Sequence, residues 1–198
     1  MKFTPTDKQI TDALRYMRVP PEGRNDELVR TVIEAFGRLE GCVTPRCVWG
    51  RFHVIHLDGG LELEGAYIYS NDIARLTSRG DDCILLAATL GHETDRQITI
   101  AQNRNMLDGI ALDACASVRV DAYIDQFMRS EIAPKLLEGE KLTHRFSPGY
   151  GDLKMEVTED IITILNATKR IGLGVTRSMM MSPVKSVTAI AGIFRKPD

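Results

Sequence analysis

Apolar residues recur at helical spacing in the N-terminal part of the chain. Thr6 and Gln9 have the spacing of a capping box, and the apolar positions that follow predict a helix that reaches Met17. Pro20–Pro21 stops this helix, and a second one is predicted from residue 25 or 26 to about residue 39. Both helices are amphipathic, so each needs a sheet or another helix against its apolar face.

The middle of the chain changes to the pattern of strands. Apolar residues at 46–57 and 61–68 flank Asp58-Gly59-Gly60, which predicts a hairpin. Ser70 is expected to cap a short helix. The continuous apolar run at 82–89 predicts a strand that is buried on both faces and leads into a further helix.

Helical spacing returns in the second half of the chain. It predicts a helix from about residue 92 to about residue 129, and an interruption near 103–105 is left open. The pattern after this helix predicts a strand at 142–146, a helix at 157–165, and strands at 171–176, 178–181 and 187–194.

One acidic residue lies within the apolar stripe of the predicted long helix. Spacings of three and four place Ser117 and Asp121 on the same face as the small and apolar residues around them. An acid in such a stripe needs a partner or a ligand. The alternative is that Asp121 lies at the edge of the stripe and reaches water, and the pattern leaves both open.

The stretch from Arg145 to Tyr150 carries the most distinctive candidate chemistry. Pro148 and Gly149 suit the two central positions of a tight turn, and the glycine lets a ligand approach the backbone closely. Arg145 offers planar donors for a carboxylate or phosphate, and Tyr150 offers a flat face with one hydroxyl. The stretch is a plausible rim for an amino-acid nucleoside, although most turns of this kind bind nothing.

Composition narrows the possible partners. The 198 residues are 43% hydrophobic and 26% charged, as in an ordinary globular protein, and the length suits one domain. A net charge of -2 provides no basic field for nucleic acid or an anionic membrane. The longest apolar run is too short to span a bilayer. We therefore expect neither nucleic acid nor a membrane as partner.

The cysteines and the start of the chain suggest a compartment. None of the four cysteines has Cys-x-x-Cys spacing or a histidine at the intervals of a zinc finger, so we expect buried or free thiols. No signal peptide is recognisable at the start of the sequence. A cytoplasmic protein is the resulting expectation. The cysteines are Cys42, Cys47, Cys83 and Cys115.

Several stretches in chain order share a pattern with one known family. The turn has the form Arg-x-x-x-Gly-Tyr, and the other matching stretches are Leu14–Tyr16, Leu85–Gly91, about 107–123, Lys169–Gly172 and Met181–Val187. Together they resemble the reactivation domain of cobalamin-dependent methionine synthase, which binds S-adenosylmethionine, in its small stand-alone form. The similarity covers nearly the whole chain.

The resemblance implies a fold and a site. It implies an α+β domain over residues 1–198, in which helices, including a helical N-terminal part of about 1–45, pack around a twisted, mainly antiparallel sheet. In the family the motif arginine binds the carboxylate of the ligand, the turn contacts the nucleoside, and an acid on the long helix adds a contact. Carried over, the ligand-binding residues are Asp121, Arg145, Ser147, Pro148, Gly149 and Tyr150.

The resemblance also implies a function. A stand-alone module of this kind binds S-adenosylmethionine and supports the reductive remethylation of oxidised cobalamin on a methionine synthase or a related methyltransferase. The chain has no Asp-x-His-x-x-Gly stretch, so cobalamin is expected only through a partner protein. A flavodoxin- or ferredoxin-type protein is the expected electron donor. No catalytic or metal-binding residue is predicted in this chain.

Differences from the family keep other functions open. The family usually has Glu where Asp121 is placed, and Arg177 stands where methionine synthase has an acid. The sequence also ends at Asp198 without the terminal aromatic segment of that enzyme. One alternative is a binding or scaffold protein that kept the fold and lost the ligand. Another is an independent methyltransferase with a different acceptor.

Overall fold

The computed structural model of the chain describes residues 4–195. The expectations for the two ends of the sequence fall partly on residues 1–3 and 196–198, which lie outside this range. The helices are α1 (Asp7–Tyr16), η1 (Pro21–Gly23), α2 (Asp26–Leu39), α3 (Asn71–Thr77), α4 (His92–Arg104), α5 (Met106–Phe127), η2 (Met128–Ile132), η3 (Ala133–Lys135), α6 (Val157–Ile164) and α7 (Ala167–Ile171). The strands are β1 (Arg46–His53), β2 (Ile55–Leu57), β3 (Gly60–Leu63), β4 (Ala66–Tyr69), β5 (Asp82–Thr89), β6 (Glu140–Leu142), β7 (Gly174–Val175), β8 (Met181–Ser182) and β9 (Ser186–Arg195).

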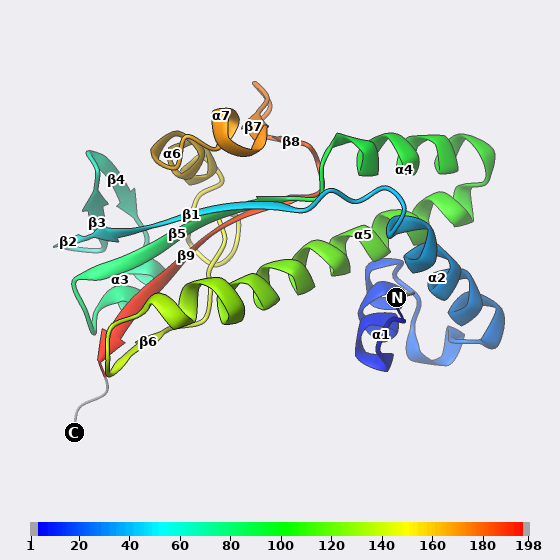
Figure 1. The fold of residues 1–198 in the computed structure, drawn as a ribbon, viewed down its shortest axis with the longest axis horizontal. Helices are drawn as coiled ribbons and strands as arrows, with labels where there is room; N and C mark the ends of the chain where they lie inside the picture. Colours follow the sequence, from blue (N-terminus) through cyan, green and yellow to red (C-terminus); the bar gives the residue numbers. More distant parts are fainter. Residues whose placement is uncertain (1–3, 196–198) are drawn as a thin grey trace.

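A four-stranded antiparallel sheet forms the middle layer, in the order β1-β5-β9-β6. The long helix α5 runs along one face of this sheet, and α6 and α7 lie on the other (Figure 1). Two smaller antiparallel sheets, β2-β3-β4 and β7-β8, stand beside it. The arrangement confirms the predicted α+β fold, with helices around a mainly antiparallel sheet.

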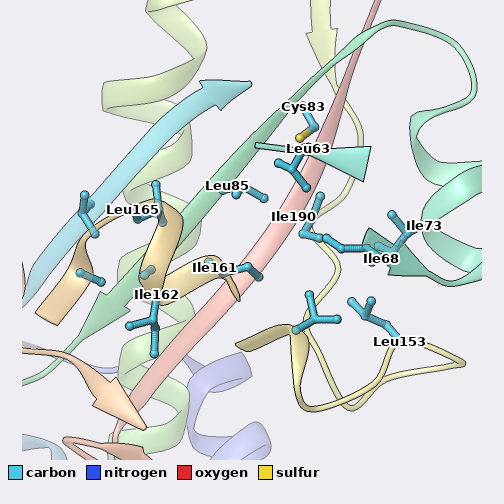
Figure 2. Close-up of a cluster of buried hydrophobic side chains, with 14 of the residues drawn as sticks. Leu63, Ile68, Ile73, Cys83, Leu85, Leu153, Ile161, Ile162, Leu165 and Ile190 are labelled. Carbon is cyan, nitrogen blue, oxygen red and sulfur yellow. The ribbon is translucent and has the colours of Figure 1, made fainter. Parts of the chain in front are cut away.

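Strand β5 is buried on both faces, as predicted. Leu85 and Ala87 belong to a core cluster with α6 and α7, whereas Ile84 and Leu86 belong to a cluster with α5. Figure 2 shows Leu85 of β5 and Ile161 of α6, which both belong to the first cluster. Successive side chains of a strand point to opposite faces, so one apolar strand supplies both layers.

The two N-terminal helices and α4 form a third core cluster with α5. α1, α2 and α4 all pack against α5, and the fully buried Phe36 and Leu112 lie in this cluster (Figure 1). The capping box of Thr6 and Gln9 is present at the start of α1, and Asn25 caps α2. Both predicted amphipathic helices are confirmed, and their apolar faces cover α5 instead of the sheet.

The predicted hairpin region is more divided than expected. The Asp58-Gly59 turn does join two strands, β2 and β3, but β1 leaves this unit and pairs with β5. The apolar run 61–68 is broken by Glu64 and Gly65, both with positive φ, into β3 and β4. A strand pattern does not specify its partner, because pairing depends on distant residues.

Three other expectations needed correction in the second half of the chain. Of the strand expected at 178–181, only Met181 pairs, as part of β8. The stretch 171–176 is not one strand: α7 ends at Ile171, Gly172 follows in a left-handed conformation, and only Gly174–Val175 pairs. The strand expected at 142–146 is shorter and earlier, as β6, and Phe146 makes only an isolated bridge to Ile190. Short apolar runs suit helices and strands equally, which explains the error at 171–176.

Within residues 4–195, no helix is both long enough and apolar enough to cross a membrane. The four cysteines are free, as expected, and Cys83 and Cys115 are buried. Burial raises the pKa of both thiols to about 12, so they are un-ionised and unreactive at neutral pH.

Asp152 ties the segment after the Pro-Gly turn to α3. Its carboxylate accepts a hydrogen bond from the Ser70 hydroxyl and others from the backbone N–H groups of Asn71 (2.8 Å) and Asp72 (3.2 Å). The next residue, Leu153, is buried in the core cluster that Figure 2 shows. These contacts fix the far end of the turn to the body of the fold.

Asp152→Asn is expected to destabilise the protein at neutral pH and to have no effect near pH 2. The hydrogen bond from Ser70, followed by those from the backbone, lowers the pKa of Asp152 to about 2 from 3.8. Because the pKa is lower in the folded state, the ionised carboxylate stabilises the fold at any pH above the pKa of the unfolded state. This stabilisation is lost as the pH falls from about 4 to about 2. Thermal unfolding across this range measures it, with Asp58→Asn in the exposed hairpin turn as control. Curves that stay equally separated from wild type at every pH would contradict the assignment.

Candidate functional site

A groove of about 540 Å³ lies between α5, the Pro-Gly turn and the segment that enters β9. This volume is typical of a site for a small molecule or cofactor. The groove is lined by Tyr16, Ser117, Val120, Asp121, His144, Arg145, Phe146, Ser147, Pro148, Tyr150, Met155, Thr158, Met181, Val184, Lys185, Ser186, Val187 and Thr188. Its walls therefore come from four parts of the chain that are far apart in sequence.

A polar stripe on α5 lines the groove through Ser117 and Asp121. Asp113, Ser117, Asp121 and Asp125 follow one another at intervals of four residues, which places them on one face of the helix. Two cations bind this stripe. Arg145 binds its C-terminal half and Lys185 its N-terminal half.

Arg145 is held by two of these carboxylates. Its Nη2 donates to Asp121 Oδ1 at 2.8 Å, and its Nε donates to Asp125 Oδ1 at 3.0 Å. Burial would lower the pKa of Arg145, but the hydrogen bonds and charges of Asp125 and Asp121 outweigh it, so the pKa is raised. The guanidinium is charged at any accessible pH, and the group of three carries one net negative charge.

The partner of Asp121 resolves the question that the helical pattern left open. This acid is paired with Arg145, and its side chain remains 36% exposed at the groove. It also accepts a hydrogen bond of 3.4 Å from the hydroxyl of Tyr16, at the end of α1. Burial first, and then the charge of Asp121, raise the pKa of Tyr16, which keeps the phenol protonated.

The predicted Pro-Gly turn is confirmed. The N–H of Tyr150 donates to the carbonyl of Ser147 at 3.3 Å, and Gly149 has a φ of 90°. Tyr150 follows the turn with 67% of its surface exposed, so its ring is available to a ligand or a partner.

The structure brings most of the predicted site residues together. Five of them line the groove, and Gly149 is not among the lining residues. Gly149 instead shapes the turn, and its N–H donates to the carbonyl of Leu153 at 2.8 Å. The five lining residues are Asp121, Arg145, Ser147, Pro148 and Tyr150.

Among the groove residues that were not identified from the sequence as site residues are Tyr16 and Lys185, whose polar groups face the stripe on α5. Tyr16 and Lys185 both lie in stretches that matched the family pattern, but nothing in their local spacing points to a ligand. Tyr16 reaches the groove because α1 packs on α5. Lys185 is 8% exposed, and its ammonium lies 2.9 Å from Asp113 Oδ1 and 3.0 Å from Ser117 Oγ.

Comparison with known proteins gives a structural match and no sequence match. No protein-family model matches the chain, and no curated protein matches its sequence. The structure is similar to the crystal structure of the MetH reactivation domain bound to AdoHcy, with a TM-score of 0.64 and 20% sequence identity. The match covers 93% of this chain and 69% of that one. The chain has the reactivation-domain fold.

The match confirms the resemblance at the level of the fold. In this reactivation-domain fold, the described residues combine a preformed groove, fixed charges of both signs and two exposed tyrosine rings at its edge. Within residues 4–195 there is no group of three or more His, Cys, Asp or Glu side chains placed to hold a metal ion. The groove is suited to holding and orienting a small zwitterion with an aromatic part.

Gly149→Ala is expected to lower the free energy of unfolding by more than Gly139→Ala does. Both glycines have positive φ, which costs an alanine roughly 1–2 kcal/mol. At Gly149 the added Cβ would also lie 2.5 Å from Met155 Sδ, whereas at Gly139 it would meet nothing within 4 Å. Urea unfolding of both variants measures the difference. Equal losses would mean that the turn does not pack against Met155.

Proposed function

We propose that this chain is a reactivation module that binds S-adenosylmethionine and supports the reductive remethylation of cobalamin on a partner protein. The observation that carries the proposal is the position of Arg145 and Asp121. They lie together in the groove of a chain whose fold matches a domain crystallised with AdoHcy. AdoHcy is the product that remains when S-adenosylmethionine gives up its methyl group.

The Arg145 end of the groove suits the amino-acid part of this ligand. Two of the guanidinium nitrogens are used by Asp121 and Asp125, which leaves Nη1 without a partner among residues 4–195. A ligand carboxylate can accept a hydrogen bond from Nη1, and charge assistance strengthens it. The net negative charge of the three groups then favours the ammonium and the sulfonium of the ligand. Asp121, inside the groove, is the residue that faces them.

The turn and the two tyrosines suit the nucleoside part. Tyr16 and Tyr150 flank the groove and offer flat apolar surfaces with one hydroxyl each. Ser147 and Pro148 add a wall to the groove. The hydrogen bond from the N–H of Gly149 to the carbonyl of Leu153 holds this wall in place. A preformed wall lowers the entropy lost on binding.

The chemistry requires alignment and little else from this chain. The methyl group is transferred from the sulfonium to the nucleophile, and the sulfur departs as a neutral thioether. No acid or base needs to assist this departure. A reduced cobalt centre on the partner supplies the nucleophile. The contribution of this chain is to hold the methyl group in line for attack, and proximity of this kind lowers a barrier by several kcal/mol, about 7–11 in the best cases.

The rim of the groove suits a docking partner. Tyr150, Met155 and Val184 line the groove and are exposed hydrophobic residues, as is Met180 beside them in sequence. Apolar groups gathered at the mouth of a site mark a surface for another protein. We assign this rim to docking on a corrinoid-carrying methionine synthase or a related methyltransferase. The proposed electron donor is a flavodoxin- or ferredoxin-type protein. In this proposal the whole chain acts as one domain, and the complex forms in the cytoplasm.

Calorimetry with S-adenosylmethionine tests the binding step. The wild type is expected to bind, and Arg145→Met is expected to weaken binding by about 1.5–3 kcal/mol, the value of a hydrogen bond to a charged group. This corresponds to a Kd about 10- to 150-fold higher. Arg96→Met is the control, because Arg96 is also paired with an acid but lies on α4, outside the groove lining. A wild type that does not bind would favour the scaffold function.

The visible spectrum of cobalamin tests the second step. A partner synthase with oxidised cobalamin, an electron donor and S-adenosylmethionine is expected to return to methylcobalamin faster when this chain is added. Tyr150→Ala, which removes an exposed ring from the rim, is expected to slow this return. Binding of S-adenosylmethionine without any change in the rate would favour an independent methyltransferase with another acceptor.

A further inference from the structure

Lys185 is a buried cation inside the groove, and the proposed contacts of the amino-acid part do not use it. It is 8% exposed, although a lysine usually extends its ammonium to water. Burying a charge is costly unless it is paired and hydrogen-bonded. Asp113 and Ser117 satisfy two of the three ammonium protons, which leaves a third donor at the groove with no partner among residues 4–195.

The backbone around Lys185 is held in place from α4 and from Leu90, the residue after β5. The carboxylate of Asp95 accepts hydrogen bonds from the N–H groups of Val184 (2.7 Å) and Lys185 (3.3 Å). The N–H of Leu90 donates to the carbonyl of Lys185 at 2.9 Å. The position of this side chain is therefore set by fixed contacts, as for residues that orient a ligand.

Lys185 and Arg145 lie at opposite ends of the polar stripe on α5. Lys185 binds Asp113 and Ser117, and Arg145 binds Asp121 and Asp125. Asp121 lies eight positions after Asp113, which corresponds to about 12 Å along the helix axis. A ligand whose amino-acid part is held at Arg145 extends toward Lys185 with its other end.

We infer that Lys185 is a second anchor of the groove, which donates a hydrogen bond to an acceptor of the nucleoside, a ring nitrogen or a ribose oxygen. Ser117 orients the ammonium by accepting one of its protons. The inference rests on the proposed function and adds a specificity residue to it. Arg145 selects the amino-acid end of the ligand and Lys185 selects the nucleoside end.

The test compares two ligands on Lys185→Met, which keeps the length of the side chain and removes its charge. One ligand is S-adenosylmethionine, and the other is 5′-methylthioadenosine, which carries the nucleoside without the amino acid. Because a charged donor is lost, the Kd for each ligand is expected to rise on the order of ten-fold. Arg119→Met is the control: Arg119 lies on α5, is paired with Glu40 at the end of α2 and is not among the lining residues, so the Kd of this variant should match wild type.

Each other outcome has a distinct meaning. A wild type that does not bind S-adenosylmethionine refutes the proposed function itself. If it binds and Lys185→Met binds both ligands equally well, the function stands and the anchor is wrong. If Lys185→Met weakens the binding of S-adenosylmethionine but not that of 5′-methylthioadenosine, Lys185 contacts the amino-acid end. If the wild type does not bind 5′-methylthioadenosine, the groove has no nucleoside anchor. Either result overturns the inference. If Lys185→Met does not fold, Lys185→Gln, which can keep a hydrogen bond to Asp113, is measured and judged in the same way.

Discussion

The ion pairs between Arg145 and the carboxylates of α5 hold the site together. They connect residues 20 and 24 positions apart, and they join the segment before the Pro-Gly turn to the longest helix of the fold. The pairs are partly shielded from water, so their attraction is stronger than that of a surface pair. With the guanidinium fixed in this way, the turn forms one wall of the groove and α5 forms the other.

This arrangement depends on how the layers are packed. β5 contributes side chains to both faces of the sheet, so α5 on one side and α6 on the other are placed relative to a single strand. Leu153 then inserts the end of the turn into the cluster beside α6, and Asp152 ties it to α3. The turn is thus held from both sides: by Arg145 toward α5 and by Leu153 toward the opposite core. A site built between two layers in this way is rigid before a ligand arrives.

The charges of the groove match the class of ligand that we propose. Lys185 and Arg145 each pair with carboxylates of the α5 stripe, and the two cations and three carboxylates together carry one net negative charge. S-adenosylmethionine also carries charges of both signs close together at one end and a neutral nucleoside at the other. The fold match is independent of this argument, because it rests on backbone geometry at 20% identity. The charge pattern therefore supports the proposed ligand, and the structural match supports the fold.

The sequence by itself determined the local elements whose signals lie within a few residues. The capping box at Thr6, the apolar strand β5 and the turn at Ser147–Tyr150 are examples, because propensity and spacing act over a single turn or strand. The family motif also pointed to Arg145. Tertiary structure alone decided that Asp125 would share this arginine and that Tyr16 would reach the groove from α1. It likewise decided that Lys185 would be buried at the end of the groove opposite Arg145. It also decided the pairing of β1 with β5 and the separation of β2–β4 into their own sheet. These outcomes depend on contacts between residues that are distant in sequence, and no local pattern encodes which distant partner a charge or a strand edge will meet.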